Sequence, residues 1–504
     1  MKPGLLECIT LFSISTVAAW LIIRLTSFLA HTRGILDRPG QHKQHKHVTP
    51  CVGGFGIFAA LFPAFCFLTS YYTELFERWM GLGISSLIIF VMGFIDDIFH
   101  LNYKIRLVVQ AAAVLVMILV SEVMLADLGK LLPAEILALP AIAIPFTLFA
   151  VIGGINAVNM IDGIDGLSGS VSLVSLILLG TVAFIADNQP SLIITIALAG
   201  GVTGFLFFNL RHPLQRHATV FLGDNGSMLL GFLIAWLLIE LSQGSNRSMT
   251  PVTALWLFSI PLMDTVGVIL RRVWQHKSPF EPDHNHLHHV FLHAGYRVTD
   301  TVFAIVLIHL LFGVIGVVSL YLRVDEHTML TLFLLCFSGY FYLSLHPRYL
   351  IAILRKLHTF LGLIPVQSHN LLLGRYSEKE AENLVYTISK ELRSKLDSLL
   401  VHVIKNKISA DNEETQYAVI ITMRLDLAGT STEKDKIMNS IELMQEHLYE
   451  IYDIQLHPFD RRVHDHGHPY RNRRLVNIRK SSWKLLTFEA TYIRDSIAEQ
   501  DFIE

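Results

Sequence analysis

The chain has 504 residues, of which 52% are hydrophobic and 16% are charged, with a mean hydropathy of +0.49. Soluble domains carry about 25% charged residues, so this composition excludes an ordinary soluble protein and predicts an integral membrane protein. The formal net charge of −2 gives no overall basic field, and we therefore expect no nucleic-acid partner.

About eleven stretches approach the roughly 20 apolar residues that a membrane-spanning helix needs. They are 5–30, 53–70, 80–95, 106–125, 135–155, 168–186, 191–209, 226–243, 251–270, 301–322 and 328–345. The first is too long for a signal-peptide core, so we interpret it as a retained span. The sequence predicts an all-α polytopic membrane bundle over residues 1–349.

Lysine and arginine are divided unevenly between the loops. One set of loops holds Arg33, Arg38, Lys43, Lys46, Lys104, Arg106, Arg211, Arg216, Arg271, Arg272, Lys277 and Arg297, and the other holds Arg78, Lys130, Arg247 and Arg323. Loops rich in these residues face the cytoplasm. This rule predicts that the first set of loops is cytoplasmic, with the N-terminus outside and the C-terminus inside.

Residues 350–504 are more polar and long enough for one small domain. Residues 378–405 and 433–451 show helical periodicity, whereas 417–425 and 483–492 are β-branched or aromatic in part. These patterns predict a small C-terminal α+β cytoplasmic domain, whose role the sequence does not indicate.

Three acidic segments lie where predicted spans end, all on the predicted cytoplasmic side. The first is GFIDDIFHLN, with Asp96 and Asp97. The second is NAVNMIDGIDGL and the third is FLGDNGSMLLG; together they contribute Asn159, Asp162, Asp165 and Asp224. A charge at the bilayer centre costs about 2.5–3.5 kcal/mol, so adjacent acids belong where a span meets water.

Helix capping is the competing interpretation of these segments, because Asp and Gly often only satisfy free backbone groups at helix ends. It is most serious for the single Asp224 and accounts poorly for the Asn and Asp residues crowded into 156–165. Carboxylates are oxygen ligands of the kind that Mg²⁺ accepts. We therefore favour a metal site shared by the three segments.

A fourth segment, RRVWQHKSPFEPDHNHLHHVFLHAGYR, is rich in histidine and basic residues. Its candidates are Arg271, Arg272, Lys277, His284, His286, His288 and His289. Zinc and a plain solvated loop are the alternatives. No cysteine is at hand, and adjacent histidines do not easily face one metal, so we favour phosphate binding. A weaker signal precedes the second span at Asp37, Arg38, Lys46 and His47.

Acidic groups that hold a divalent metal, and basic groups that hold phosphates, together meet the needs of phosphoryl transfer. Their place beside lipid suggests one water-soluble and one lipid-borne substrate. The alternatives are a multi-span transporter with a regulatory cytoplasmic domain, and an inactive scaffold. The acids lie at span ends rather than at midplane, which favours the enzyme.

These motifs, over about residues 33–345, resemble those of the polyprenyl-phosphate N-acetylhexosamine-1-phosphate transferases (glycosyltransferase family 4). The chain looks most similar to the bacterial undecaprenyl-phosphate GlcNAc-1-phosphate transferase branch, and more distantly to phospho-MurNAc-pentapeptide translocase. SPFEPDHNHLHH followed by HAGY matches the His-x-His-His element of the family at His286, His288 and His289.

The resemblance implies transfer of a sugar-1-phosphate from a UDP-sugar to undecaprenyl phosphate, which releases UMP and starts lipid-linked cell-surface glycan synthesis. It implies Mg²⁺ or Mn²⁺ as cofactor and leaves room for a homodimer. The implied metal ligands are Asp224 and Asp97, and Asp96 or Asp97 would act on the lipid phosphate. The implied substrate-binding residues are Asn159, Asp162, Asp165, Lys46, His47, Arg271, Arg272, Lys277, His286, His288 and His289. Asn225, where many relatives carry a small or apolar residue, and the segment beyond about 350 depart from the family pattern.

Overall fold

The computed structural model describes residues 4–33, 49–131, 140–212, 214–215, 217–244, 247–276, 278, 286–361, 367–376, 400–408, 416–425 and 457–458. It divides into two compact units, one of residues 1–292 and 298–351 and one of residues 293–297 and 352–504. Lys46, His47 and Lys277 lie outside the described residues, as do the predicted helix 433–451 and the predicted strand 483–492.

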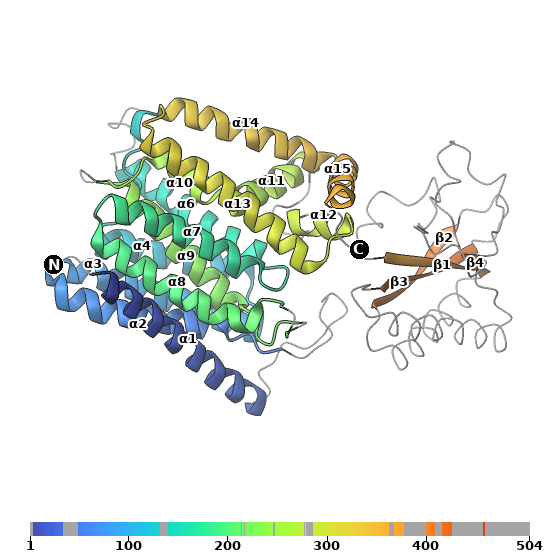
Figure 1. The fold of residues 1–504 in the computed structure, drawn as a ribbon, viewed down its shortest axis with the longest axis horizontal. Coiled ribbons are helices and arrows are strands. Elements are labelled where there is room, and N and C mark those ends of the chain that lie inside the picture. Colours follow the sequence, from blue (N-terminus) through green and yellow to red (C-terminus); the bar gives the residue numbers. More distant parts are fainter. Residues whose placement is uncertain are drawn as a thin grey trace. The chain divides into compact units, whose positions relative to one another are not determined.

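The helices follow one another through most of the described chain (Figure 1). They are α1 (Leu5–Arg33), α2 (Gly53–Tyr71), η1 (Thr73–Leu75), α3 (Phe76–Phe99), α4 (Tyr103–Ser121), η2 (Gly129–Leu131), α6 (Pro140–Ile161), α7 (Leu167–Ile185), α8 (Gln189–Asn209), α9 (Gly223–Ser242), α10 (Pro251–Leu257), α11 (Ser259–Trp274), α12 (Leu287–His293), α13 (Val298–Tyr321), α14 (Glu326–Leu345) and α15 (Pro347–Phe360).

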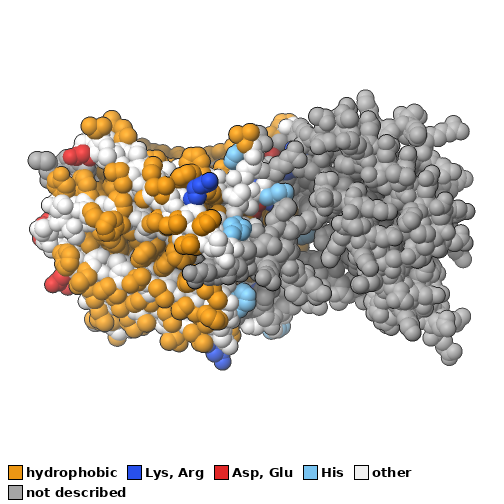
Figure 2. All heavy atoms as spheres, turned by 90° about the horizontal axis from the view of Figure 1, so that it is seen from below, with side chains coloured by type: hydrophobic (Ala, Val, Ile, Leu, Met, Phe, Trp, Pro, Cys, Tyr) orange, Lys and Arg blue, Asp and Glu red, His pale blue; other side chains and the backbone are white. Residues whose placement is uncertain are grey.

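Ten of the described helices are long and apolar enough to cross a membrane, and the pair α10 and α11 forms an eleventh candidate with a bend of 85°. This confirms the predicted polytopic helical bundle. Figure 2 shows apolar side chains covering most of the visible surface of the helical unit, which is what a lipid-facing surface requires.

Helix α9 lies at the centre of the bundle, since nearly all of its side chains are buried. Helices α2, α3 and α6 pack against it. Because α9 begins at Gly223 while α3 and α6 end at Phe99 and Ile161, the three acidic segments meet at one end of the bundle.

The break between α10 and α11 is closed by side chains from two other helices. Ser175 on α7 donates a hydrogen bond to the backbone carbonyl of Leu257 (3.1 Å). The buried imidazole of His309 on α13 contacts the Ser175 hydroxyl through Nε2 (2.8 Å) and the Ser259 hydroxyl through Nδ1 (3.3 Å). A backbone group freed by the bend is therefore satisfied inside the bundle, as an apolar environment demands.

The second unit contains a four-stranded antiparallel sheet of order β2-β3-β1-β4. Its strands are β1 (Gln367–Tyr376), β2 (Leu400–Ile408), β3 (Gln416–Leu425) and β4 (His457–Pro458). Strand β3 confirms the predicted strand 417–425. The predicted helix 378–405 is wrong at its end, because 400–405 belong to β2, which pairs with β3 along its length.

Helices α1 and α8 approach closely through two glycines of α8. A Cβ atom added to Gly200 would lie 2.6 Å from the carbonyl oxygen of Phe12, and one added to Gly204 would lie 2.6 Å from that of Thr16. Glycines spaced four apart let helix backbones touch within membranes. The contact therefore depends on the absence of side chains at these two positions.

We predict that Gly204→Leu lowers stability by about 1–3 kcal/mol, because an overpacked contact must force the two helices apart. The measurement is the midpoint of thermal unfolding in detergent. Gly153→Leu is the control, since no atom lies within 4 Å of a Cβ added there. Equal midpoints for the two variants would contradict the close packing of α1 on α8.

Candidate active site

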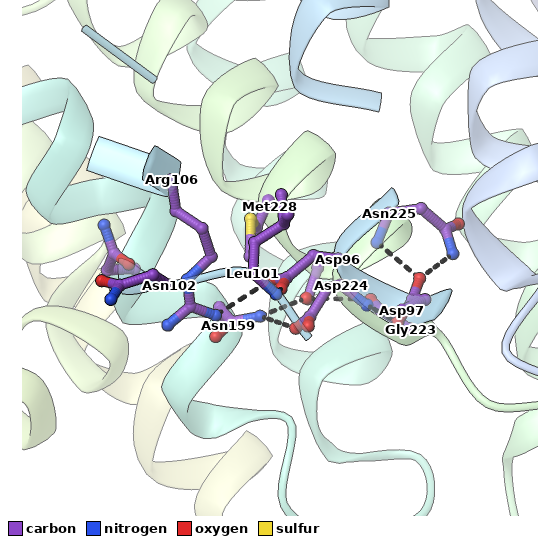
Figure 3. A network of polar contacts seen from close by, with 12 residues as sticks. Asp96, Asp97, Leu101, Asn102, Arg106, Asn159, Gly223, Asp224, Asn225 and Met228 are labelled. Atoms are coloured by element: carbon purple, nitrogen blue, oxygen red, sulfur yellow. Dashed lines mark hydrogen bonds and ion pairs between the residues drawn. The ribbon is translucent and has the colours of Figure 1, made fainter. Parts of the chain in front are cut away.

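The carboxylate of Asp97, near the end of α3, caps the N-terminus of α9. Its Oδ1 accepts a hydrogen bond from the backbone N–H of Asp224 (2.8 Å), and its Oδ2 accepts one from that of Asn225 (3.1 Å). The side-chain amide of Asn225 also donates to Oδ2 (Figure 3). An acidic group at a helix N-terminus satisfies free N–H groups and favours the helix dipole. Capping therefore applies to α9, but the cap is Asp97 rather than Asp224.

This contact needs glycine on both helices. A Cβ atom added to Gly93 on α3 would lie 2.6 Å from the Cα of Asn225. Gly223 has a φ of +74°, and a Cβ atom there would lie 2.8 Å from the Asp97 carboxylate. The glycines of GFIDD and LGDNG thus allow the two acidic segments to meet.

Asp224 projects from the first turn of α9 toward α6. Asn159, near the end of α6, donates a hydrogen bond from its amide to Asp224 Oδ1 (2.6 Å) and another to the Ser227 hydroxyl (2.9 Å). The second and third acidic segments are therefore joined side chain to side chain (Figure 3).

Asp96 has different partners from its neighbour Asp97. Its Oδ2 forms an ion pair with Arg106 on α4 (2.9 Å), and its Oδ1 accepts from the backbone N–H of Leu101 (2.7 Å). Asp96 therefore shares its charge with a cation and closes the turn between α3 and α4. The partners of Asp97 in the described part of the chain are uncharged N–H groups, so no basic side chain among these contacts compensates its negative charge.

Asp162 lies in the turn that follows α6. Burial, and then the charges of Asp224, Asp165 and Asp97, raise the pKa of this carboxyl group from 3.8 to about 8. Like charges that disfavour ionisation in this way must lie close together. Asp97, Asp162 and Asp224 thus form one acidic cluster at the end of the bundle.

Asp165, in the same turn, contacts the segment between α8 and α9. Its Oδ2 accepts from the guanidinium of Arg211 (2.7 Å) and from the backbone N–H of Ala218 (3.1 Å). Nearby, Asn209 accepts from the Gly166 N–H (2.7 Å) and donates to the Val220 carbonyl (2.9 Å). These contacts tie the turn that carries Asp162 to the segment between α8 and α9.

The histidine segment reaches the acidic turn at Gly163. The imidazole of His288 lies so close that a Cβ atom added to Gly163 would be 2.2 Å from its Nε2. His288 is 1% exposed, and neither of its ring nitrogens has a hydrogen-bond partner among the residues that the structure describes. Burial, and then the neighbouring His289, hold the pKa of His288 well below its usual value. An unsatisfied buried imidazole at this place indicates a binding site for a polar ligand.

The other two histidines lie beside His288. The ring of His286 is 5.7 Å from that of His288 and nearly parallel to it, and the His289 ring is 4.1 Å from the His288 ring. Arg271 and Arg272, in the last turn of α11, are buried. The structure therefore brings the acidic and the imidazole groups to the same end of the bundle.

Sequence reasoning missed one charged residue that contacts this set. Asp264, within α11, contacts Nδ1 of His286 through its Oδ2 (2.8 Å). An acid inside an apolar stretch is a functional candidate by default, and that signal in 251–270 could have found it.

The donor set fits a cation of the magnesium type. In the described part of the chain, no three His, Cys, Asp or Glu side chains are arranged to hold a metal by themselves. Mg²⁺ is usually held by one or two carboxylates, with water and substrate phosphate completing its octahedron. Asp97, Asp162 and Asp224 supply hard oxygen donors whose mutual repulsion a cation would relieve.

A multi-pass helical bundle that gathers carboxylates and imidazoles at one end has the attributes of a membrane enzyme acting on phosphates. Comparison with known proteins agrees with this class. Residues 79–242 match the family described as glycosyl transferase family 4.

Several relatives are named undecaprenyl-phosphate alpha-N-acetylglucosaminyl 1-phosphate transferase. The protein from Salmonella typhi is 38% identical over 347 residues, which cover 68% of this chain and 91% of the relative. That from Escherichia coli (strain K12) is 37% identical over 343 residues, covering 66% and 91%. That from Haemophilus influenzae is 33% identical over 333 residues, covering 66% and 93%. The chain belongs to glycosyl transferase family 4, in the branch of these transferases, which confirms the resemblance seen in its motifs.

The raised pKa of Asp162 predicts a pH dependence of stability. Because the folded-state pKa of about 8 lies above the ordinary 3.8, the folded protein binds this proton more tightly. The Asp162 contribution to stability is therefore present at low pH and is lost as the pH rises toward 8. We expect Asp162→Asn to reduce this loss, measured as thermal unfolding midpoints between pH 5 and 9 with EDTA.

Glu122→Gln, which changes an exposed acid at the end of α4, is the control and should keep the wild-type slope. A slope for Asp162→Asn as steep as that of the wild type would mean that Asp162 is not under the repulsion described.

Proposed function

We propose that this protein transfers a HexNAc-1-phosphate, with GlcNAc-1-phosphate as the first candidate, from a UDP-sugar to undecaprenyl phosphate. The products are UMP and a lipid-linked diphosphate sugar. The observation that carries the proposal is the meeting of Asp97, Asp162 and Asp224 with the imidazole of His288 at Gly163. Membership of the transferase family supports the same reaction.

The reaction forms one P–O bond and breaks another. A phosphate oxygen of the lipid acceptor attacks the phosphorus that carries the sugar, and the bridging oxygen leaves with UMP. Positioning and charge neutralisation supply most of the catalysis in phosphoryl transfer. The arrangement of fixed acids and bases at one end of the bundle supports both.

On the acceptor side, we assign Asp96 and Asp97 to the lipid phosphate and its proton. Asp96 pairs with Arg106, whereas Asp97 has no basic partner among its described contacts, so Asp97 is the better metal neighbour, together with Asp224. A bound Mg²⁺ or Mn²⁺ would neutralise phosphate charge during the transfer.

On the donor side, Asn159, Asp162 and Asp165 would line the nucleotide and metal region. The basic and imidazole groups would bind the diphosphate of the UDP-sugar. They are Lys46, His47, Arg271, Arg272, Lys277, His286, His288 and His289. The position of His288 against the Asp162 turn supports the assignment of these two sets to one substrate.

We further propose that the site faces the cytoplasm from the bacterial inner membrane, with the N-terminus outside. The uneven loop charges support this orientation. The transporter hypothesis gains no support, because the matched family and the named relatives are transferases.

The direct test is UMP release from UDP-GlcNAc by the purified protein, with undecaprenyl phosphate and Mg²⁺ each present or omitted. Release that needs both would support the proposal, whereas release without the lipid would indicate simple hydrolysis. A panel of UDP-sugars then identifies the donor.

We predict that Asp224→Asn folds and inserts normally yet loses activity by about 100-fold or more, because one carboxylate of the metal site is removed. Folding should survive, since the bonds of Asp97 go to the backbone N–H groups of α9 rather than to the Asp224 side chain. UMP release and the thermal unfolding midpoint are the two measurements.

The control is Asp127→Asn, a partly exposed acid paired with Arg247 outside the cluster, which should keep wild-type turnover. Full activity in Asp224→Asn would remove Asp224 from the proposed metal site.

We also predict that a protein ending at Leu361 keeps its basal chemistry, because every proposed catalytic group precedes residue 290. This end point retains α15, whose Leu354 carbonyl accepts a hydrogen bond from Tyr296 (3.0 Å) and whose His358 packs on the Tyr296 ring. UMP release by the truncated protein, normalised to inserted protein, is the measurement. An inert but correctly inserted truncation would show that the C-terminal part contributes to the site.

A further inference from the structure

Asp264 is a buried acid within α11, outside the motifs that identify the family site. It is 2% exposed. Charged groups in membrane-spanning segments are rare and usually serve function. The contacts of its two carboxylate oxygens indicate its role.

One oxygen of Asp264 contacts the histidine segment. Oδ2 lies 2.8 Å from Nδ1 of His286, which is itself only 6% exposed. A carboxylate that forms this bond in its ionised state can only accept, so Nδ1 carries the hydrogen and Nε2 is the ring atom directed away from Asp264. The bond therefore fixes both the orientation of the imidazole and the position of its protons.

The other oxygen is held by two donors. Oδ1 accepts from the backbone N–H of Leu287 at the start of α12 (2.9 Å) and from the hydroxyl of Tyr340 on α14 (2.7 Å). A carboxylate held by three donors, two from the adjacent residues His286 and Leu287 and one from Tyr340 on α14, has little freedom to turn. Tyr340 and Leu287 thus fix Asp264, and Asp264 fixes His286.

The fixed imidazole supports the remaining histidines. The His286 ring lies nearly parallel to that of His288, at an interplanar angle of 5°, and His288 rests against Gly163 in the acidic turn. Rotation of His286 would disturb this stack. A series of contacts therefore leads from Asp264 through His286 and His288 to the acidic turn.

We propose that Asp264 is a positioning residue for the sugar-1-phosphate transfer, with Tyr340 as its support, and that it acts by orienting His286 toward the diphosphate of the donor. This inference rests on the proposed function. It differs from a purely structural role in α11 because it requires that the effect of Asp264 pass through His286.

The main variant is Asp264→Asn, which has nearly the same shape. The amide oxygen can still accept from Leu287 and Tyr340, but the NH₂ group then faces Nδ1 and favours the opposite tautomer of His286. We expect kcat/KM for UDP-GlcNAc to fall about 10–100-fold, as for other residues that orient a functional histidine, with little change in the unfolding midpoint. Asp264→Glu should recover part of the loss.

Tyr340→Phe should give a smaller loss of the same kind. Its matched control is Tyr342→Phe, on the same helix, because the Tyr342 side chain is 58% exposed and does not contact Asp264 in the described contacts. Equal activities for these two tyrosine variants would overturn the role of Tyr340.

A double-mutant cycle separates positioning from structure. Asp264→Asn should add no further loss to His286→Gln if Asp264 acts through that ring. Losses that multiply in the double variant, or a wild-type kcat/KM in Asp264→Asn, would overturn the inference.

A binding measurement separates this inference from the proposed function. UDP should raise the unfolding midpoint of the wild-type protein and do so less for Asp264→Asn. If UDP stabilises the wild-type protein but no UMP is released, the proposed reaction is contradicted and the inference is not. The inference is then decided by whether UDP raises the unfolding midpoint of Asp264→Asn less than that of the wild type. A wild type that UDP does not stabilise, or an equal shift in both proteins, would overturn the inference.

Discussion

The carboxylate of Asp97 accepts hydrogen bonds from the first backbone N–H groups of α9, and the rest of the site depends on this contact. Helix α9 is enclosed by its neighbours, so its free N–H groups need partners from the protein. An acid from α3 supplies them and thereby joins the first acidic segment to the third. The same choice places Asp97 beside Asp224. The hydrogen bonds of Asp97 thus satisfy the N-terminus of α9 and also bring two carboxylates together.

This charge is then distributed unequally. Arg106 pairs with Asp96, and Arg211 pairs with Asp165. Arg106 also attracts the nearby Asp224, whereas Asp97 and Asp162 have no basic partner among the described contacts. The two arginines lie at the edges of the acidic cluster and stabilise the turns that carry it. The uncompensated groups are the ones that also repel one another, as the raised pKa of Asp162 shows. Such a site favours a ligand that brings positive charge.

The sequence was sufficient for the spans and for the meeting of the acidic segments, because hydropathy and loop position depend on the local chain. It did not distinguish Asp96 from Asp97, since the difference arises from Arg106 on one side and the N-terminus of α9 on the other. Asp264 stood in the sequence as an acid inside the apolar stretch 251–270, but its role could not be predicted, because its partners His286 and Tyr340 come from distant segments. Strand β2 was assigned partly to a helix, because LVHVIKNKI is short and pairing with β3 decides its conformation.

The bend between α10 and α11 has a consequence for how an intramembrane histidine should be interpreted. Both ring nitrogens of His309 are occupied by serine hydroxyls, and one of these serines in turn binds the carbonyl exposed by the bend. If the two helices became straight, the Leu257 carbonyl would lose the hydrogen bond from Ser175, which it needs in an apolar environment. His309 therefore supports the bent main chain through two serine hydroxyls, and this bend of 85° sets the direction in which α11 carries Asp264.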